Sequence, residues 1–183
     1  MLQGLEGYNG WLSGSTEQLE STVTAYNKRL IYYIFSITGN PDGAEDLASD
    51  VFVRLLMKKP RFRCEEQLSS WLFKTAHNLA EDALRKRKGA SVPLDEAPEQ
   101  PGESEVLDEL LQNDRMKTLH AALSELSGDY RSVLTLFYFD GLSYAQIASV
   151  LKKNEKQIRN IAYRAKIRLK DQLERMGFEY ENR

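Results

Sequence analysis

The chain has 183 residues, and its 27 acidic side chains slightly outnumber its 25 lysines and arginines, which gives a formal net charge of -2. The total charge therefore excludes a general attraction to polyanions, and any binding of nucleic acid must come from local clusters of cations. The single cysteine, Cys64, excludes an internal disulfide and indicates a reducing compartment. Together with His77 and His120 it gives no metal-ligand spacing, so we expect no cofactor.

The sequence also lacks the pattern of a membrane protein. No apolar run approaches the roughly 18 residues that cross a bilayer, and the first cation is Lys28, unlike the basic start of a signal peptide. We therefore expect a cytoplasmic protein with no membrane insertion of its own.

The N-terminal half is predicted to form three amphipathic helices. The first spans about 15–38, with Ser15 as its N-cap and Gly39 as its end. The second begins at Asn40-Pro41, a cap residue followed by proline at the first helical position, and ends near 58–60. The third spans about 66–88, after the loop "PRFRCEEQ", and ends in the basic run "RKRK".

An acidic segment follows these helices. From Val92 to Asp114 the chain holds three prolines, eight acids and no lysine or arginine. Such a composition cannot form a core, and we place a linker at 89–102. Two interpretations of the acids stay open: a solvated tether, or a mask over a basic surface of the same chain. Apolar residues at helical spacing then predict one continuous helix over 104–126.

The C-terminal stretch "GLSYAQIASVLKKNEKQIRNIAYRAKIRL" predicts two helices around a tight break. Ser143 and Gln146 fit a capping box for the first, and the second begins near Asn154. From Lys152 to Lys170 there are eight cations and a single acid, and most cations fall on the side of the second helix opposite its apolar stripe. This is the helix-turn-helix plan, although the turn lacks its usual glycine. The local charge predicts salt-dependent binding to DNA phosphates.

No segment alternates between apolar and polar residues as a strand does, so the expected fold is all-α. We predict two small helical domains, 1–88 and 103–183, joined by the acidic, flexible linker 89–102.

Two blocks of the sequence, in this order, resemble an extracytoplasmic-function (ECF) sigma factor of the sigma-70 superfamily. The first comprises "GNPDGAEDLASDVFVRLL" and "SSWLFKTAHNLAEDALRKRK"; the second is the helix-turn-helix stretch. The resemblance covers nearly the whole chain and identifies 1–88 with sigma region 2 and 103–183 with sigma region 4. It implies a protein that binds core RNA polymerase, recognises the promoter minus-ten and minus thirty-five elements, and helps to open the DNA. It also implies an anti-sigma factor as a partner.

The resemblance assigns candidate residues to three surfaces. The surface that binds core polymerase would comprise Glu45, Asp46, Leu47, Ser49, Asp50, Val53 and Arg54. The minus-ten surface would comprise Arg61, Phe62, Arg63, Trp71, Lys74, Asn78, Asp82, Arg85, Lys86, Arg87 and Lys88. The minus thirty-five surface would comprise Lys153, Asn154, Glu155, Lys156, Gln157, Arg159, Asn160, Tyr163, Arg164 and Lys166.

Chemistry refines some of these assignments. An amide such as Asn78 both donates and accepts at a base edge, Phe62 can stack on an unpaired base, and Arg159 suits guanine. Packing roles stay open for Phe62 and Trp71, and the basic run after Leu84 also suits a helix C-terminus. The chain departs from the common pattern at Ile161, where arginine is frequent, which leaves the preferred bases open.

Three other classes of function compete with this interpretation. A stand-alone helix-turn-helix regulator explains the C-terminal half but gives no role to the basic end of the third helix. An enzyme is disfavoured because the two histidines lie in different domains and no glycine-rich phosphate loop is present. A helical adaptor would show no salt-dependent affinity for DNA.

Overall fold

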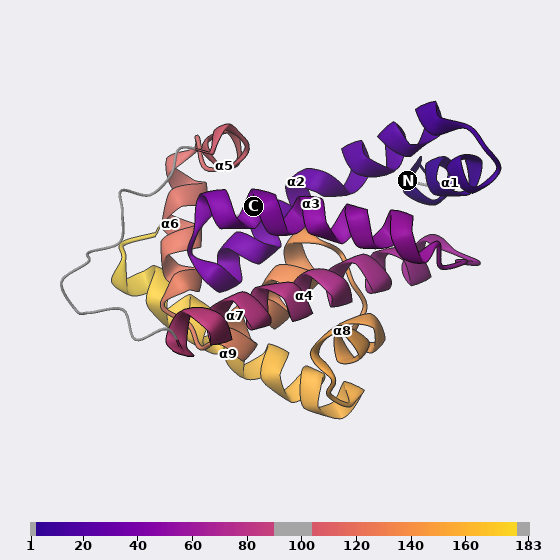
Figure 1. Ribbon diagram of the computed structural model, residues 1–183. Coiled ribbons are helices and arrows are strands. Elements are labelled where there is room, and N and C mark those ends of the chain that lie inside the picture. Colours follow the sequence, from indigo (N-terminus) through magenta and orange to yellow (C-terminus); the bar gives the residue numbers. More distant parts are fainter. Residues whose placement is uncertain (1–2, 90–103, 179–183) are drawn as a thin grey trace.

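The computed structural model describes residues 3–89 and 104–178, and all regular structure in these ranges is helical (Figure 1). The N-terminal half, residues 3–89, contains α1 (Gln3–Leu12), the 3-10 turn η1 (Thr16–Gln18), α2 (Leu19–Thr38), α3 (Pro41–Lys58) and α4 (Glu65–Gly89). The C-terminal half, residues 104–178, contains α5 (Glu105–Leu110), α6 (Asp114–Ser124), α7 (Gly128–Leu134), the π-helical turn η2 (Thr135–Phe139), α8 (Tyr144–Leu151) and α9 (Glu155–Arg175). The all-α prediction is confirmed.

Local capping chemistry sets several boundaries as predicted. The Asn40 side chain accepts a hydrogen bond from the Gly43 amide at 3.3 Å, with proline next in the chain. Gly39 ends α2 in the left-handed conformation at φ 65°. Ser143 and Gln146 exchange the two bonds of a capping box at 3.3 and 2.8 Å. These boundaries depend on residues within one turn of each other, which is why the sequence predicts them.

Two predictions about helices are wrong, and α1 was not predicted at all. The sequence did not predict α1, because its glycines, Gly4, Gly7 and Gly10, are poor helix formers. Ser15 makes no side-chain cap bond, and α2 begins only at Leu19, after the 3-10 turn. The expected helix over 104–126 is divided, because the Asn113 side chain accepts from the Arg115 amide at 2.9 Å and caps a new helix there.

The core of the N-terminal half lies between α2, α3 and α4. Its largest fully buried side chains include Tyr26, Tyr33 and Phe73. The C-terminal half packs against the same layer, so that Leu142, Ile147 and other residues of that half belong to one continuous apolar cluster with α2 and α4. The predicted linker at 89–102 lies, except for Gly89, outside the described residues. In the part of the chain that is described, no helix is long and apolar enough to cross a bilayer.

Candidate nucleic-acid interface and the contact between the halves

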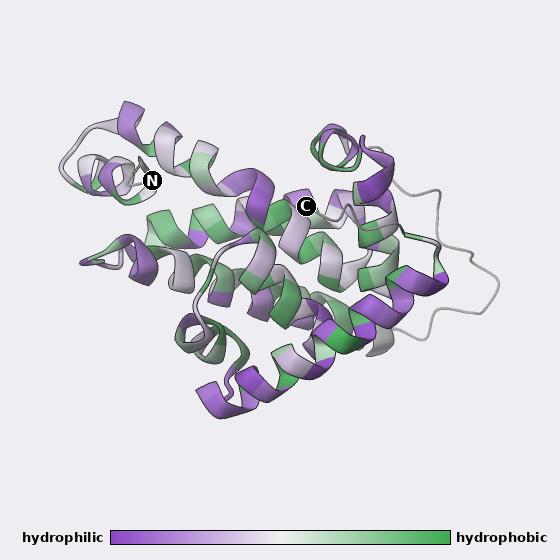
Figure 2. Cartoon of the chain, turned by 180° about the vertical axis from the view of Figure 1, so that it is seen from behind, coloured by the Kyte–Doolittle hydropathy of each residue, from purple (hydrophilic) through white to green (hydrophobic). Residues whose placement is uncertain are grey.

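Helix α9 presents its cations to solvent, as predicted. Ile158, Ala162 and Ala165 are buried, whereas the predicted DNA-facing residues between Asn154 and Lys166 are exposed and Lys153 is half-buried. Figure 2 shows this helix at the surface of the molecule, hydrophilic along most of its length. Tyr163 is 69% exposed although it is aromatic.

Several α9 side chains have structural partners as well. The Asn154 and Gln157 side chains form a second capping box, with both bonds at 2.8 Å. Arg159 pairs with Glu155 one turn earlier, and its guanidinium lies 5.3 Å from the centre of the Tyr144 ring. The amide oxygen of Gln157 is therefore occupied at the helix start, whereas the Arg159 side chain is 62% exposed and its ion-pair partner lies on the same helix.

The turn between α8 and α9 works without glycine. Lys152 adopts the left-handed conformation at φ 54°, and the Lys153 amide donates to the Ala148 carbonyl at 3.0 Å, so the helix end closes as it would with glycine. The Lys153 ammonium is 3.1 Å from a carboxylate oxygen of Asp129 on α7. This ion pair binds the turn to the body of the C-terminal half.

The predicted minus-ten residues lie on α4 and the loop before it. Trp71, Lys74, Asn78 and Asp82 are half-buried along α4, and the cations that follow Leu84 are exposed, except that the Lys88 side chain lies outside the described part. Arg85 is 2.7 Å from a carboxylate oxygen of Asp82. In the loop, Phe62 is half-buried against the edge of Trp71, with 6.2 Å between ring centres. The loop and the helix thus form one surface.

Helix α3 exposes most of the residues predicted to bind core polymerase. Asp46, Ser49, Asp50, Val53 and Arg54 are exposed. Two others are engaged within the chain: Glu45 accepts a hydrogen bond from the Ser104 hydroxyl, and Leu47 packs against the core. Met57, which is not among the predicted residues, is 78% exposed one turn after Val53. Its spacing of four residues from Val53 was the available signal.

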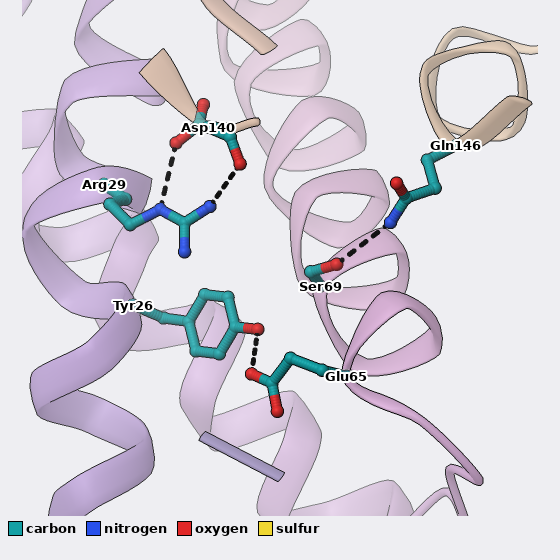
Figure 3. Close-up of polar contacts among 6 residues, drawn as sticks. All are labelled: Tyr26, Arg29, Glu65, Ser69, Asp140 and Gln146. Atoms are coloured by element: carbon teal, nitrogen blue, oxygen red, sulfur yellow. Dashed lines mark hydrogen bonds and ion pairs between the residues drawn. The ribbon is translucent and has the colours of Figure 1, made fainter. Parts of the chain in front are cut away.

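The contact between the two halves contains a partly buried ion pair between residues that the sequence did not single out. Arg29 on α2 donates to Oδ1 of Asp140 at 3.3 Å and to the Asp140 carbonyl at 2.6 Å (Figure 3). Burial raises the pKa of the Asp140 carboxyl from 3.8 to about 7, and Arg29 opposes part of that rise. The other oxygen of this carboxylate, Oδ2, is buried without a hydrogen-bond partner among the described residues. The pair thus joins the two halves, and Arg29 offsets part of the cost of burying the Asp140 charge.

Polar contacts also join α8 to α4. The Gln146 amide donates to the Glu66 carbonyl at 3.1 Å and to the Ser69 hydroxyl at 3.2 Å. Figure 3 shows Gln146 approaching Ser69 from the opposite side of the space that Arg29 and Asp140 enter. Next to this contact, a groove of about 510 Å³ separates the two helices and is lined by Phe62, Trp71 and Lys74 on one side and Ala145, Gln146 and Ser149 on the other. Helix α8 thus stands against the predicted minus-ten surface.

The two histidines take part in packing. His77 shares a 3.0 Å hydrogen bond with the Tyr33 hydroxyl, and His120 stacks on Phe35 with 4.9 Å between ring centres. Burial lowers the pKa of both imidazoles below their ordinary value of 6.5. Both rings contact α2, and His120 does so from the C-terminal half. His77 is thus a half-buried side chain held against α2.

Comparison with known proteins identifies the family. Residues 22–90 match the sigma-70 region 2 model, and residues 116–169 match the sigma-70 region 4 model. The chain belongs to the sigma-70 family. The two matches cover α3, α4, α7 and α8 and most of α2, α6 and α9, and they leave α1 and α5 of this sigma factor outside.

Relatives support the same assignment over most of the chain. The sigma factor is similar to RNA polymerase sigma factor YlaC of Bacillus subtilis, with 27% identity over 84% of this chain and 91% of the relative. It is similar to the ECF sigma factor SigW of the same organism, with 26% identity over 87% of this chain and 91% of the relative. Its fold resembles that of the sigma factor RpoE in complex with the anti-sigma factor NepR from Bartonella quintana, with a TM-score of 0.64, 24% identity, and coverage of 87% and 98% of the two chains. The resemblance to ECF sigma factors is confirmed.

Proposed function

We propose that this sigma factor binds core RNA polymerase through α3, contacts the minus-ten element through α4 and its preceding loop, contacts the minus thirty-five element through α9, and promotes opening of the DNA. The observation that carries the proposal is the presence of both sigma regions in order, each with an exposed cationic helix surface. In this proposal the protein acts by binding, and the polymerase catalyses RNA synthesis. Because the sigma factor acts on the polymerase, its proposed location is the cytoplasm.

The geometry requires the two halves to separate on the promoter. The names of the two elements place them about 25 base pairs apart, or about 85 Å at about 3.4 Å per base pair. A compact chain of this length has a radius of gyration of only about 16 Å. The contact between α8 and α4 also covers part of the predicted minus-ten surface. The packed arrangement is therefore the free form, and the DNA-bound form is open.

A protein inhibitor of the anti-sigma class is part of the proposal. RpoE of Bartonella quintana, whose fold this chain shares, was solved with the anti-sigma factor NepR. An inhibitor that binds both halves would keep the packed form closed. Purification of the tagged sigma factor from stressed and unstressed cells tests this, and recovery of polymerase alone under every condition would contradict it.

Run-off transcription tests the main proposal. Purified core polymerase and this protein are combined on genomic fragments, and start sites are mapped. Defined starts that depend on the protein support the proposal. A dimer that binds a palindrome and leaves transcription by core polymerase unchanged would instead identify a stand-alone helix-turn-helix regulator.

Replacing Asn78 with alanine is expected to lower initiation without weakening the affinity for core polymerase. The Asn78 side chain is half-buried on the polar side of α4, where its amide would donate to and accept from a base edge. We expect a loss of about tenfold in open-complex formation, comparable to one base contact. Asn27→Ala is the matched control, because Asn27 is also a half-buried amide within a helix. Equal initiation rates for both variants at every promoter would rule out the role of Asn78.

Replacing Arg159 with alanine is expected to cost about 1–3 kcal/mol of binding at one upstream base position. The guanidinium is 62% exposed on α9, and its present partner, Glu155, lies on the same helix. Affinity is measured by titrating holoenzyme against duplexes that differ at single positions of the minus thirty-five element. Arg168→Ala, two to three turns along the same helix, controls for loss of charge alone. A uniform loss across all duplexes would make Arg159 a phosphate contact.

A further inference from the structure

Helix α1 lies outside the region 2 match, yet it is built into the N-terminal half. Figures 1 and 2 both place it at the end of the molecule where the loop between α3 and α4 turns. A Cβ at Gly4 would overlap the Tyr26 ring, and one at Gly7 would overlap the Ser21 hydroxyl and the Gln18 carbonyl. The Gly4 carbonyl accepts a hydrogen bond from the buried Thr22 hydroxyl at 2.7 Å. Glycine on this face thus permits α1 to pack directly against η1 and α2.

Other residues of α1 contact the loop at 59–64. Tyr8 is fully buried, and its hydroxyl donates to the Pro60 carbonyl at 2.7 Å. The Tyr8 ring lies 5.5 Å from the Phe62 ring, centre to centre. The Lys59 ammonium lies 5.4 Å from the centre of the Trp11 ring. Three successive parts of the loop are therefore in contact with α1: its left-handed start, its proline and its aromatic residue.

The start of α4 is attached to α1 as well. The two carboxylate oxygens of Glu65 accept from the Leu5 amide, at 2.8 Å, and from the Tyr26 hydroxyl. Glu65 is the first residue of α4, so this carboxylate joins α1, α2 and α4 at one point. The loop is consequently held at its beginning by Tyr8 and at its end by Glu65.

We propose that α1 is a positioning element for the minus-ten surface: Tyr8 fixes the backbone of the loop at Pro60 and forms the wall against which the Phe62 ring is presented. The inference rests on the proposed function, because it assumes that this loop receives an unpaired base. A loop in several conformations would have to be ordered when DNA binds, and that ordering would lower the affinity. By fixing the loop beforehand, α1 removes this cost.

The test measures binding of holoenzyme to a single-stranded oligonucleotide that carries the minus-ten element, with 2-aminopurine at the base to be unstacked. Tyr8→Phe keeps the ring and removes the bond to Pro60, so we expect the affinity to fall about threefold to tenfold, as for one lost hydrogen bond. Tyr8→Ala also removes the wall behind Phe62 and should lower the affinity further and reduce the 2-aminopurine signal. Affinity for core polymerase and for a duplex with only the minus thirty-five element should stay unchanged. Asn9→Ala, on the exposed side of α1, is the control.

Each outcome decides between specific alternatives. An equal loss in all three binding measurements, or in thermal stability alone, would assign Tyr8 to folding and overturn the inference. Unchanged oligonucleotide binding in Tyr8→Phe and Tyr8→Ala would also overturn it. A companion variant, Phe62→Ala, separates this failure from failure of the proposed function. If Phe62→Ala lowers oligonucleotide affinity and the Tyr8 variants do not, the minus-ten surface is retained and only the role of α1 is lost; if none of them does, both are wrong.

Discussion

In the Arg29→Ala variant the two halves of the chain are expected to separate, and to separate further as the pH rises from about 7 to about 8.5. Removal of Arg29 leaves the Asp140 carboxylate, whose side chain is 2% exposed, without its cation. At pH 7 the carboxyl, whose pKa is about 7, avoids most of the cost of this loss by taking up a proton, so the ratio of closed to open molecules should fall only about twofold. At pH 8.5 the fall should reach at most about thirtyfold, because protonation of Asp140 then costs more.

The pH dependence follows from the protonation of Asp140. Its pKa is raised to about 7 in the closed form, from 3.8 for the free carboxyl, so the closed form binds a proton that the open form releases. Rising pH thus weakens closure between these values, by about tenfold per unit, and has no further effect above about 7 in the native protein. Arg29 lowers this pKa, so its removal extends the window upward. His77 and His120, whose pKa values are lowered, stay neutral above pH 7 and do not contribute.

The measurement is energy transfer between dyes on the two halves. Exposed serines on α3 and α6, Ser49 and Ser124, are changed to cysteine in a Cys64→Ser background. The double variant Arg29→Ala with Asp140→Asn is the control, because a neutral side chain at position 140 removes the pH dependence between about 7 and 8.5. Equal energy transfer in Arg29→Ala and the native chain at both pH values would show that this ion pair does not hold the halves together.

The sequence predicts features whose causes lie within a turn or two of the chain. The start of α3 at Asn40-Pro41 and the capping box of Ser143 and Gln146 are examples, since each partner lies three residues or fewer from the other. The exposed side of α9 is also predicted, because the period of a helix places Ile158 and Ala162 together and leaves Arg159 outside. For these elements, local and tertiary preferences agree.

Features that depend on distant partners were not predictable in this way. Helix α1 has a glycine at every third position from Gly4 to Gly10, which lowers helix propensity, and only the close approach of η1 and α2 explains it. The Arg29 and Asp140 pair joins residues that are 111 positions apart, and neither residue stands in a motif. The contact of α8 with α4 has the same character: both helices were predicted, but no pattern in either one indicates the other as its partner.

Cross-linking the halves in the packed form is expected to abolish promoter-dependent transcription. Ser70 on α4 and Ser149 on α8 both line the groove between these helices, so cysteines at these positions, with Cys64→Ser, can be joined by a short bis-maleimide with an internal disulfide. The joined helices cannot separate by the distance between the two promoter elements, about 85 Å. We expect run-off transcription to fall more than tenfold.

Reduction of the disulfide in the bis-maleimide cross-linker then provides a control within the same sample. It frees the halves but leaves both cysteines modified. Transcription that returns on reduction shows that separation of the halves, and not the modification, limits initiation. Each single-cysteine variant treated with the same reagent should remain active. If the joined protein transcribes as well as the reduced one, the packed arrangement is compatible with promoter binding, and the two surfaces on α4 and α9 cannot be the ones that contact both elements at once.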